Sequence, residues 1–170
     1  MTSDDACLDA FQRELDYVFR TLRRLGTSPS EMEDLAQEVF LALHRSWCKY
    51  DSRRPLRPYL FGIAFRLASA HYRKRSREVA FGVVELRDSR PAPDEALQSR
   101  QLRTMMLAAL ERIPLPRRAV LVMRDLDDVP VGEVASVLGI PLFTAYSRLR
   151  KARRELEAGV RRMLKEVDGR

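Results

Sequence analysis

Aromatic and basic side chains are interleaved between residues 59 and 77, and their types suit the binding of nucleic acid. The members of this group are Tyr59, Phe61, Phe65, Arg66, Tyr72, Arg73, Lys74 and Arg75. Aromatic rings stack on unpaired bases while cations bind the phosphates, and each stacked base contributes roughly 1–3 kcal/mol. The pattern therefore predicts a surface that captures single-stranded nucleic acid. The alternative for Phe61 and Phe65 is that they complete an apolar core.

A second group follows a glycine in the C-terminal part of the chain. A short apolar segment over residues 130–138 ends at Gly139, and a helical pattern resumes by Ala145. Gly139 supplies the left-handed conformation that a tight turn needs, and the small Ala135 permits close approach of two helices. The pattern is typical of a helix-turn-helix. A helical hairpin that does not bind DNA is the alternative.

The second helix of this motif carries side chains that suit base edges near its start and phosphates further along. These are Phe143, Thr144, Tyr146, Ser147, Arg148, Arg150, Lys151 and Arg154. Two windows, residues 143–154 and 66–77, contain several basic residues and no acidic residue. Such runs are often solvated helix faces, but two of them in one small chain of net charge +7 favour binding to nucleic acid.

A third group lies on a helix expected to begin near Met32. Leu35, Ala36, Val39, Phe40 and Leu43 are spaced so that they share one face. The opposite face shows Asp34, Gln37, Glu38 and Leu41, which suits a partner helix with basic side chains, with a solvated surface as the alternative. A capping box of Ser28 with Glu31 would start the helix, and Ser30 with Glu33 is an equally allowed register.

Catalytic, metal and cofactor chemistry find no support in the sequence. Cys7 and Cys48 belong to no metal or disulfide pattern and are expected to be buried thiols. His44 and His71 accompany no nucleophile motif, and no glycine-rich phosphate loop is present. The N-terminus lacks a secretory pattern, and no apolar run approaches the roughly 20 residues of a membrane span. We therefore expect a cytoplasmic protein without enzymatic activity, bound cofactor, metal or membrane insertion.

Helical spacing dominates and strand signals are poor, so the sequence predicts an all-α fold. We expect two small helical domains, residues 1–78 and 99–170, joined by a flexible linker over residues 79–98 that contains Pro91 and Pro93. A helix from about Pro58 to Arg77 should bury Leu60, Ile63, Ala64 and Leu67, and the last helix should keep one buried seam from Ala145 to Met163. Helices are also expected over residues 97–113 and from Pro114 through Met123.

Three segments together resemble a known family. Residues 34–40 read DLAQEVF, residues 59–64 read YLFGIA and lead to HYRKR at 71–75, and the helix-turn-helix covers residues 133–153. In this order and spacing the chain resembles the small extracytoplasmic-function group of sigma-70-type RNA polymerase sigma factors. The resemblance implies two helical domains without a large N-terminal autoinhibitory region. It also implies that the chain binds core RNA polymerase and directs promoter-specific initiation.

The resemblance implies a partner for each surface. Polymerase, through its β′ clamp helices and its β subunit, would contact Asp34, Leu35, Gln37, Glu38, Phe40 and Leu41. Melted −10 DNA would contact the aromatic and basic group of residues 59–75, and −35 duplex DNA would contact the residues named above for the second helix of the motif. An anti-sigma protein, which holds many family members inactive, is a further candidate partner.

Several positions depart from the family pattern, and they bear on the promoter sequence rather than on docking. Tyr59, Arg66 and Ala70 stand where Trp, Asn and Asp are usual, and Phe143, Ala145 and Tyr146 stand where Gly, Val and Lys are usual. Two other functions are compatible with parts of the pattern. One is a stand-alone helix-turn-helix regulator that does not need polymerase. The other is a nuclease or recombinase, which would require a carboxylate cluster or activated nucleophile that the sequence does not show.

Overall fold

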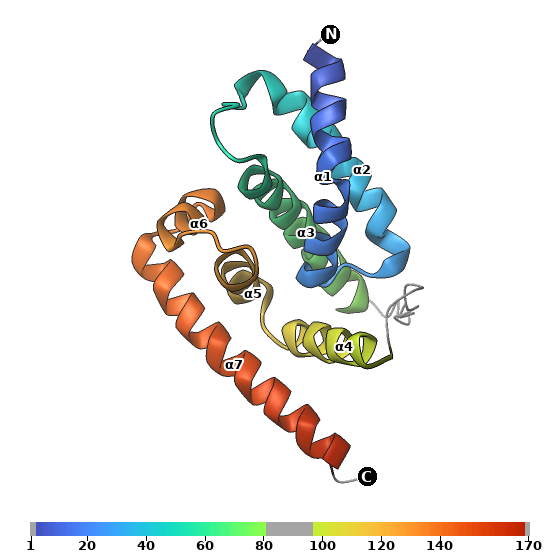
Figure 1. Ribbon diagram of the computed structural model, residues 1–170, viewed down its shortest axis with the longest axis vertical. Helices are drawn as coiled ribbons and strands as arrows, with labels where there is room; N and C mark the ends of the chain where they lie inside the picture. The colour runs from blue at the N-terminus through green and yellow to red at the C-terminus, as the bar shows by residue number, and fades with distance from the viewer. Residues whose placement is uncertain (1–2, 81–96, 169–170) are drawn as a thin grey trace. The chain divides into compact units, whose positions relative to one another are not determined.

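The computed structural model describes residues 3–80 and 97–168, and every regular element in these ranges is helical (Figure 1). An N-terminal unit contains α1 (Ser3–Leu25), α2 (Met32–Ser46) and α3 (Leu56–Ala80). A C-terminal unit contains α4 (Leu97–Glu111), α5 (Leu115–Leu121), α6 (Val131–Leu138) and α7 (Leu142–Asp168). The predicted all-α class is confirmed. The expected linker falls mostly on residues 81–96, outside the described residues, while α3 and α4 extend two residues into its ends.

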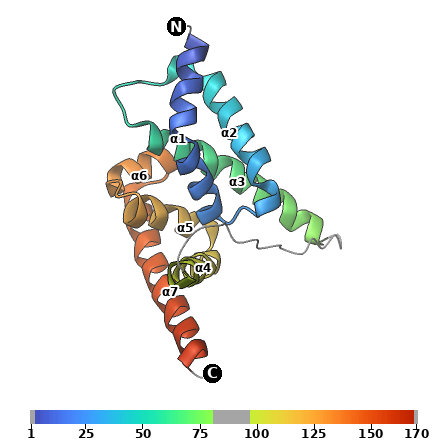
Figure 2. The same ribbon diagram turned by 45° about the vertical axis from the view of Figure 1, so that its right-hand side comes forward.

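In the N-terminal unit, α1 and α2 lie side by side and run in opposite directions (Figure 2). Asp4 at the start of α1 accepts a hydrogen bond from His44 near the end of α2 at 3.1 Å, and the rings of Phe11 and Phe40 lie 5.1 Å apart. Sequence patterns did not single out α1. Its role is to close the apolar side of α2, which a two-helix arrangement would leave in water.

Helices α2 and α3 pack against each other and carry the buried stripes that the spacing predicts. Leu35, Ala36, Val39 and Leu43 are buried on α2, as are Leu60, Ile63 and Ala64 on α3, whereas Leu67, predicted to be buried with them, is half-buried. Helix α2 follows the Ser28–Glu31 capping box, so this register is the one used. The Glu31 carboxylate accepts hydrogen bonds from the Ser28 hydroxyl at 2.5 Å and from the Ser28 backbone N–H at 3.4 Å.

The two cysteines differ, and the expectation for one of them is wrong. Cys7 is buried in α1, and burial, with the nearby Asp4 carboxylate, raises the pKa of its thiol. Cys48 is exposed because it lies in the short 3-10 turn Trp47–Lys49 that follows α2, where the chain leaves the core. Neither forms a disulfide.

The C-terminal unit is built on α7, against which α4, α5 and α6 pack (Figure 1). The seam predicted for α7 is buried at Ala145, Leu149, Ala152 and Met163 but only half-buried at Leu156 and Val160. Helix α5 continues into a single π-helical turn, Val122–Leu126, before the chain enters α6. Within the described ranges, no helix is both long and apolar enough to cross a membrane.

Gly139 makes the turn between α6 and α7. Its backbone adopts φ 64° and ψ 38°, the left-handed conformation that glycine tolerates without strain. Its N–H and that of Ile140 return to the carbonyls of Ser136 and Ala135 at 3.3 and 3.0 Å, which closes the end of α6. The predicted helix-turn-helix is therefore present, with α6 as its first helix and α7 as its second.

Candidate nucleic-acid interface

The outward face at the start of α7 gathers all the side chains predicted to contact duplex DNA. Phe143 and Tyr146 are 83% and 56% exposed. Arg150, Lys151 and Arg154 are also exposed, whereas Thr144, Ser147 and Arg148 are half-buried. The opposite face of these turns is occupied by the buried seam, so α7 is amphipathic with a polar, aromatic and basic outer side.

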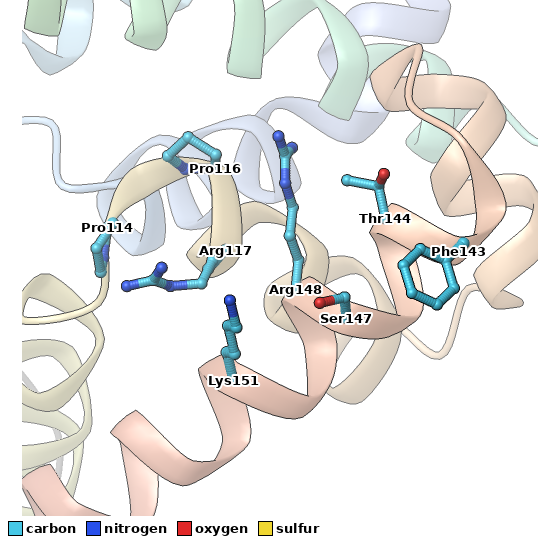
Figure 3. Close-up of a pocket in the computed structure, with 8 residues that line it drawn as sticks. All are labelled: Pro114, Pro116, Arg117, Phe143, Thr144, Ser147, Arg148 and Lys151. Carbon is cyan, nitrogen blue, oxygen red and sulfur yellow. The ribbon is translucent and has the colours of Figure 1, made fainter.

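Helix α5 contributes to this region a cation that the sequence analysis did not single out. Arg117 lies with residues of α7 around a hollow of about 360 Å³, which we call the cationic hollow (Figure 3). The residues that line the hollow are Pro114, Pro116, Arg117, Phe143, Thr144, Ser147, Arg148 and Lys151. Arg117 lies outside the two basic windows that the sequence shows. Only the packing of α5 on α7 brings it beside the cations of α7.

One basic residue of α7 is held away from this face by an acidic partner. Arg153 donates two hydrogen bonds to Asp125, from Nε at 2.8 Å and from Nη2 at 2.7 Å. These bonds lower the pKa of the Asp125 carboxyl, against the opposing effect of its partial burial. Asp125 lies in the π-helical turn after α5. The ion pair therefore explains why Arg153 does not belong with the outward cations of the same helix.

The C-terminal half of α3 carries the second basic surface. Tyr72 is 58% exposed, and Arg66, Arg73 and Lys74 are exposed as well. Ala70, Arg73, Lys74 and Arg77 line a shallow hollow of about 480 Å³. This half of the helix thus offers one accessible ring together with cations that can follow a nucleic-acid backbone.

Arg75 is tied into the N-terminal unit more closely than its neighbours. Its Nη1 lies 3.7 Å from Glu31, and His71 Nδ1 lies 3.6 Å from the same carboxylate. Partial burial raises the pKa of Glu31, but the Ser28 hydrogen bond and the charges of His71 and Arg75 outweigh it, so that the net pKa is lowered. Arg75 therefore supports the junction of α2 and α3 as well as the basic surface.

The structure corrects the prediction for Phe61. Its side chain is completely buried, so neither face of its ring can stack on a base. The physical reason is that the first half of α3 is buried over a wide arc, where Leu60, Phe61, Ile63 and Ala64 are all covered. Phe65 is half-buried and keeps only part of its ring accessible. Of the three rings spaced along this line, Tyr72 is the one that is largely exposed.

Two aromatic residues that the sequence analysis missed lie beside Tyr59. The rings of Trp47 and Tyr50 stack 5.3 Å apart, and Tyr50 lies 5.3 Å from the half-buried Tyr59. The Trp-x-x-Tyr spacing before the turn-rich segment 50–55 is the signal that could have indicated them. They form an aromatic ladder at the start of α3, in which the Tyr59 ring is already partly covered.

Of the six residues of α2 predicted to contact a partner, four are exposed on one face and two point elsewhere. Asp34, Gln37 and Glu38 are exposed and Leu41 is 44% exposed. Leu35 is 3% exposed and belongs to the core, which contradicts its prediction as a contact residue. Phe40 is half-buried between the rings of Phe11 and His44, at 5.1 and 6.0 Å. Leu35 and Phe40 therefore orient the face that the other four present.

Among the described residues, no three His, Cys, Asp or Glu side chains gather closely enough to hold a metal ion. The surfaces that the structure assembles are cationic and aromatic on α3 and α7, and acidic with an exposed leucine on α2. Surfaces of these two kinds suit a polyanion and a protein respectively.

Comparison with known proteins gives consistent matches over both units. Residues 10–78 match the family model Sigma-70 region 2, and residues 103–156 match the model Sigma-70, region 4. The ECF RNA polymerase sigma factor SigE of Mycolicibacterium smegmatis is 28% identical over 163 residues, which cover 91% of this chain and 63% of that protein. The ECF RNA polymerase sigma factor EcfG of Rhodopseudomonas palustris is 31% identical over 140 residues, covering 79% and 74%.

A solved structure shows the same fold. The sigma factor RpoE of Bartonella quintana, in complex with the anti-sigma factor NepR, is similar with a TM-score of 0.70. The similarity covers 89% of this chain and 97% of that one at 23% sequence identity.

Proposed function

This chain belongs to the sigma-70 family of RNA polymerase sigma factors, in its extracytoplasmic-function group, and we propose that it directs core RNA polymerase to promoters through three separate surfaces. The first docks on polymerase, the second reads −35 duplex DNA, and the third captures melted −10 DNA. The observation that carries the proposal is that the exposed docking face on α2 and the exposed cations of α3 and α7 lie on the segments that match the family models.

Docking on polymerase is assigned to Asp34, Gln37, Glu38 and Leu41 of α2. The face combines two carboxylates and an amide with one exposed leucine. Such a surface fits a partner helix whose basic side chains pair with the carboxylates while an apolar side chain covers the leucine. We propose that this partner is the pair of clamp helices of the β′ subunit, with the β subunit as a further contact.

Binding of −35 DNA is assigned to the outer face of α7. Phe143 and Tyr146, at the start of α7, are exposed enough to contact base edges. The major groove is wide enough to accommodate one helix. Arg150, Lys151 and Arg154 follow where the groove walls present phosphates. Because residues 143 and 146 depart from the family pattern, we expect the preferred −35 sequence to differ from that of relatives.

Capture of melted −10 DNA is assigned to α3. Tyr72 supplies an accessible ring for an unpaired base, and Arg66, Arg73 and Lys74 supply charge for the phosphates. Stacking and phosphate contacts together offset the few kcal/mol that unstacking a base costs. The chain performs no reaction itself in this proposal, and its place of action is that of polymerase and promoter, the cytoplasm.

An anti-sigma protein is a further partner that we propose for this chain. The support is its similarity in fold to RpoE, whose structure was solved with the anti-sigma factor NepR. A stand-alone regulator is not favoured, because the matched family acts with polymerase and both of its regions are present.

Charge reversal on the docking face tests the proposal. The double variant Asp34→Lys, Glu38→Lys should lose association with core polymerase, because its lysines would repel basic partner side chains. Asp34 lies in the first turn of α2, where a lysine costs about 0.5 kcal/mol, too little to unfold the unit. Co-purification of core polymerase with the tagged full-length chain measures the loss, and circular dichroism checks the fold.

The matched control reverses two exposed carboxylates on α1, Asp9→Lys with Asp16→Lys, which changes the net charge by the same amount. It should retain polymerase. Unchanged co-purification of the α2 double variant would overturn the docking assignment, and equal loss in the control would show that overall charge rather than this face governs association.

A further inference from the structure

We propose that the cationic hollow holds one phosphate of the DNA backbone next to the −35 bases, and that Arg117 of α5 is the residue that contacts it from outside the helix-turn-helix. The inference rests on the proposed role of α7 as the helix that reads duplex DNA. It adds a contact on a different helix, one that would set how α7 is oriented in the groove rather than which base it prefers.

The chemistry of the lining points to an anion. Three cationic side chains, Arg117, Arg148 and Lys151, line the hollow together with the hydroxyls of Thr144 and Ser147. All of these groups donate hydrogen bonds, and the two prolines of the lining have no backbone N–H that would need an acceptor. Figure 3 shows Lys151 extending from α7 toward Arg117 on α5, whose own guanidinium points toward Pro114.

Glu155 fixes the position of Arg117. Its carboxylate accepts hydrogen bonds from Nε of Arg117 at 3.0 Å and from Nη2 at 2.6 Å, a bidentate pair. A guanidinium has five N–H donors, so this pairing uses two and leaves three for another acceptor. The carboxylate thus holds the guanidinium in one orientation, which lowers the entropic cost of a further contact.

The phosphodiester of a duplex is the ligand that the location favours. Phe143 and Thr144, at the start of α7, line the hollow and also belong to the predicted base-reading face. Thr144 and Lys151 are seven residues apart, or about 10 Å along a helix, which is close to the roughly 12 Å width of the major groove. With α7 in the groove, the hollow would therefore face a wall of the groove, where the backbone runs.

Salt dependence of DNA binding tests this contact without knowledge of the promoter. Each phosphate contact adds about 0.9 to the slope of log K against log salt for duplex DNA, whatever its sequence. The full-length chain is titrated with a 30-base-pair fluorescent duplex over a range of KCl concentrations. Arg117→Gln should reduce the slope by about 0.9 and weaken binding equally for unrelated sequences.

Arg161→Gln is the matched control. Arg161 lies on α7 and, like Arg117, is paired with a glutamate, Glu157 at 2.6 Å, but it does not line the hollow. Both variants remove one paired arginine and one unit of charge, so a general effect of charge would change both slopes alike. Equal slopes for Arg117→Gln and Arg161→Gln would overturn the proposed contact.

Lys151→Gln separates this outcome from failure of the proposed function. A reduced slope for Lys151→Gln with an unchanged slope for Arg117→Gln would retain α7 as the DNA-binding helix and remove only Arg117. An unchanged slope for both variants would contradict the assigned DNA-binding face of α7. The proposed contact of Arg117 with a phosphate would then also be wrong. Circular dichroism melting curves establish that all variants are folded at the titration temperature.

Free phosphate is the other source of the same chemistry. Inorganic phosphate added at constant ionic strength should not raise the melting temperature of the wild-type chain, because the open hollow needs the neighbouring groove contacts to hold a phosphate. A phosphate-induced rise that disappears in Arg117→Gln, together with an unchanged DNA slope, would assign the hollow to a small anion and overturn the proposal.

Discussion

Phe61 and Tyr72 lie eleven residues apart on α3. Their spacing suggests one shared role, but their surroundings give the two rings different roles. Phe61 has no exposed surface, whereas Tyr72 is 58% exposed among cations. A ring that is wholly covered contributes to stability, and a ring in water beside basic residues can bind a base. Arg153 and Arg154 are both exposed, but Arg153 is paired with Asp125 and is thereby held in a different direction.

Truncation of each ring should therefore change a different quantity. Tyr72→Ala should weaken binding of polymerase holoenzyme to a promoter fragment with a single-stranded −10 segment about 10-fold, with little change in unfolding free energy. Phe61→Ala should lower the free energy of unfolding by about 3–5 kcal/mol through the cavity that it leaves. Binding to pre-melted fragments and urea unfolding measure the two effects.

Phe61→Leu is the milder control, since it keeps most of the buried volume and should retain both folding and −10 binding. If Tyr72→Ala lowered the stability of the chain while leaving binding to the melted segment intact, the assignment of its ring to DNA would be wrong.

At the scale of elements, the turn between α6 and α7 determines where the outer face of α7 points. Gly139 is held at φ 64°, and a Cβ built there meets no atom within 4 Å. The only penalty for a side chain at this position is therefore the left-handed backbone itself. Gly132, within α6, also has open space around a built Cβ but does not adopt a positive φ.

Alanine at these two glycines should act in opposite directions. Gly139→Ala should destabilise the chain by about 1 kcal/mol, because an L-residue is strained in this conformation. Gly132→Ala should be neutral or stabilising by up to about 1 kcal/mol, since alanine is favoured over glycine in a helix. Thermal unfolding followed by circular dichroism compares them. Equal destabilisation by both changes would mean that side-chain crowding, rather than backbone conformation, governs these positions.

At the scale of the whole molecule, the chain combines two helical units and a net charge of +7. Each unit carries one DNA-binding surface in our proposal, and neither surface is large. Polymerase that holds both units would raise the effective concentration of each surface for its part of the promoter. Without polymerase this increase in effective concentration is absent, and the free chain binds DNA through its own phosphate contacts alone.

The free full-length chain should therefore bind duplex DNA weakly and with steep salt dependence. Four cations of α7, Arg148, Arg150, Lys151 and Arg154, would contribute about −3.6 to the slope of log K against log salt, a loss on the order of 100-fold between 50 and 200 mM salt, and the proposed Arg117 contact would add about −0.9. Fluorescence anisotropy on an unrelated duplex measures the slope. A slope near zero would contradict electrostatic binding by α7, and the quadruple variant with glutamine at these positions shows the background.

The class of fold and the helix-turn-helix follow from the sequence because they depend on local patterns. Apolar residues at helical spacing predict α2, α3 and α7, and Gly139 marks the turn by its own conformational freedom. The exposure of the face that we assign to docking was predictable for the same reason, since Asp34 and Glu38 lie opposite a clear apolar stripe. In each case the information lies within a few turns of one helix.

Tertiary packing alone decided which members of each pattern are available for binding. Periodicity shows that Phe61 and Tyr72 lie along related faces of α3, but only the neighbouring helices determine that Phe61 is covered. Likewise, the placement of α5 and its π-helical turn beside α7 brings Arg117 to the cationic hollow and pairs Arg153 with Asp125. These contacts join residues far apart in the chain, so no local pattern of residue types can specify them.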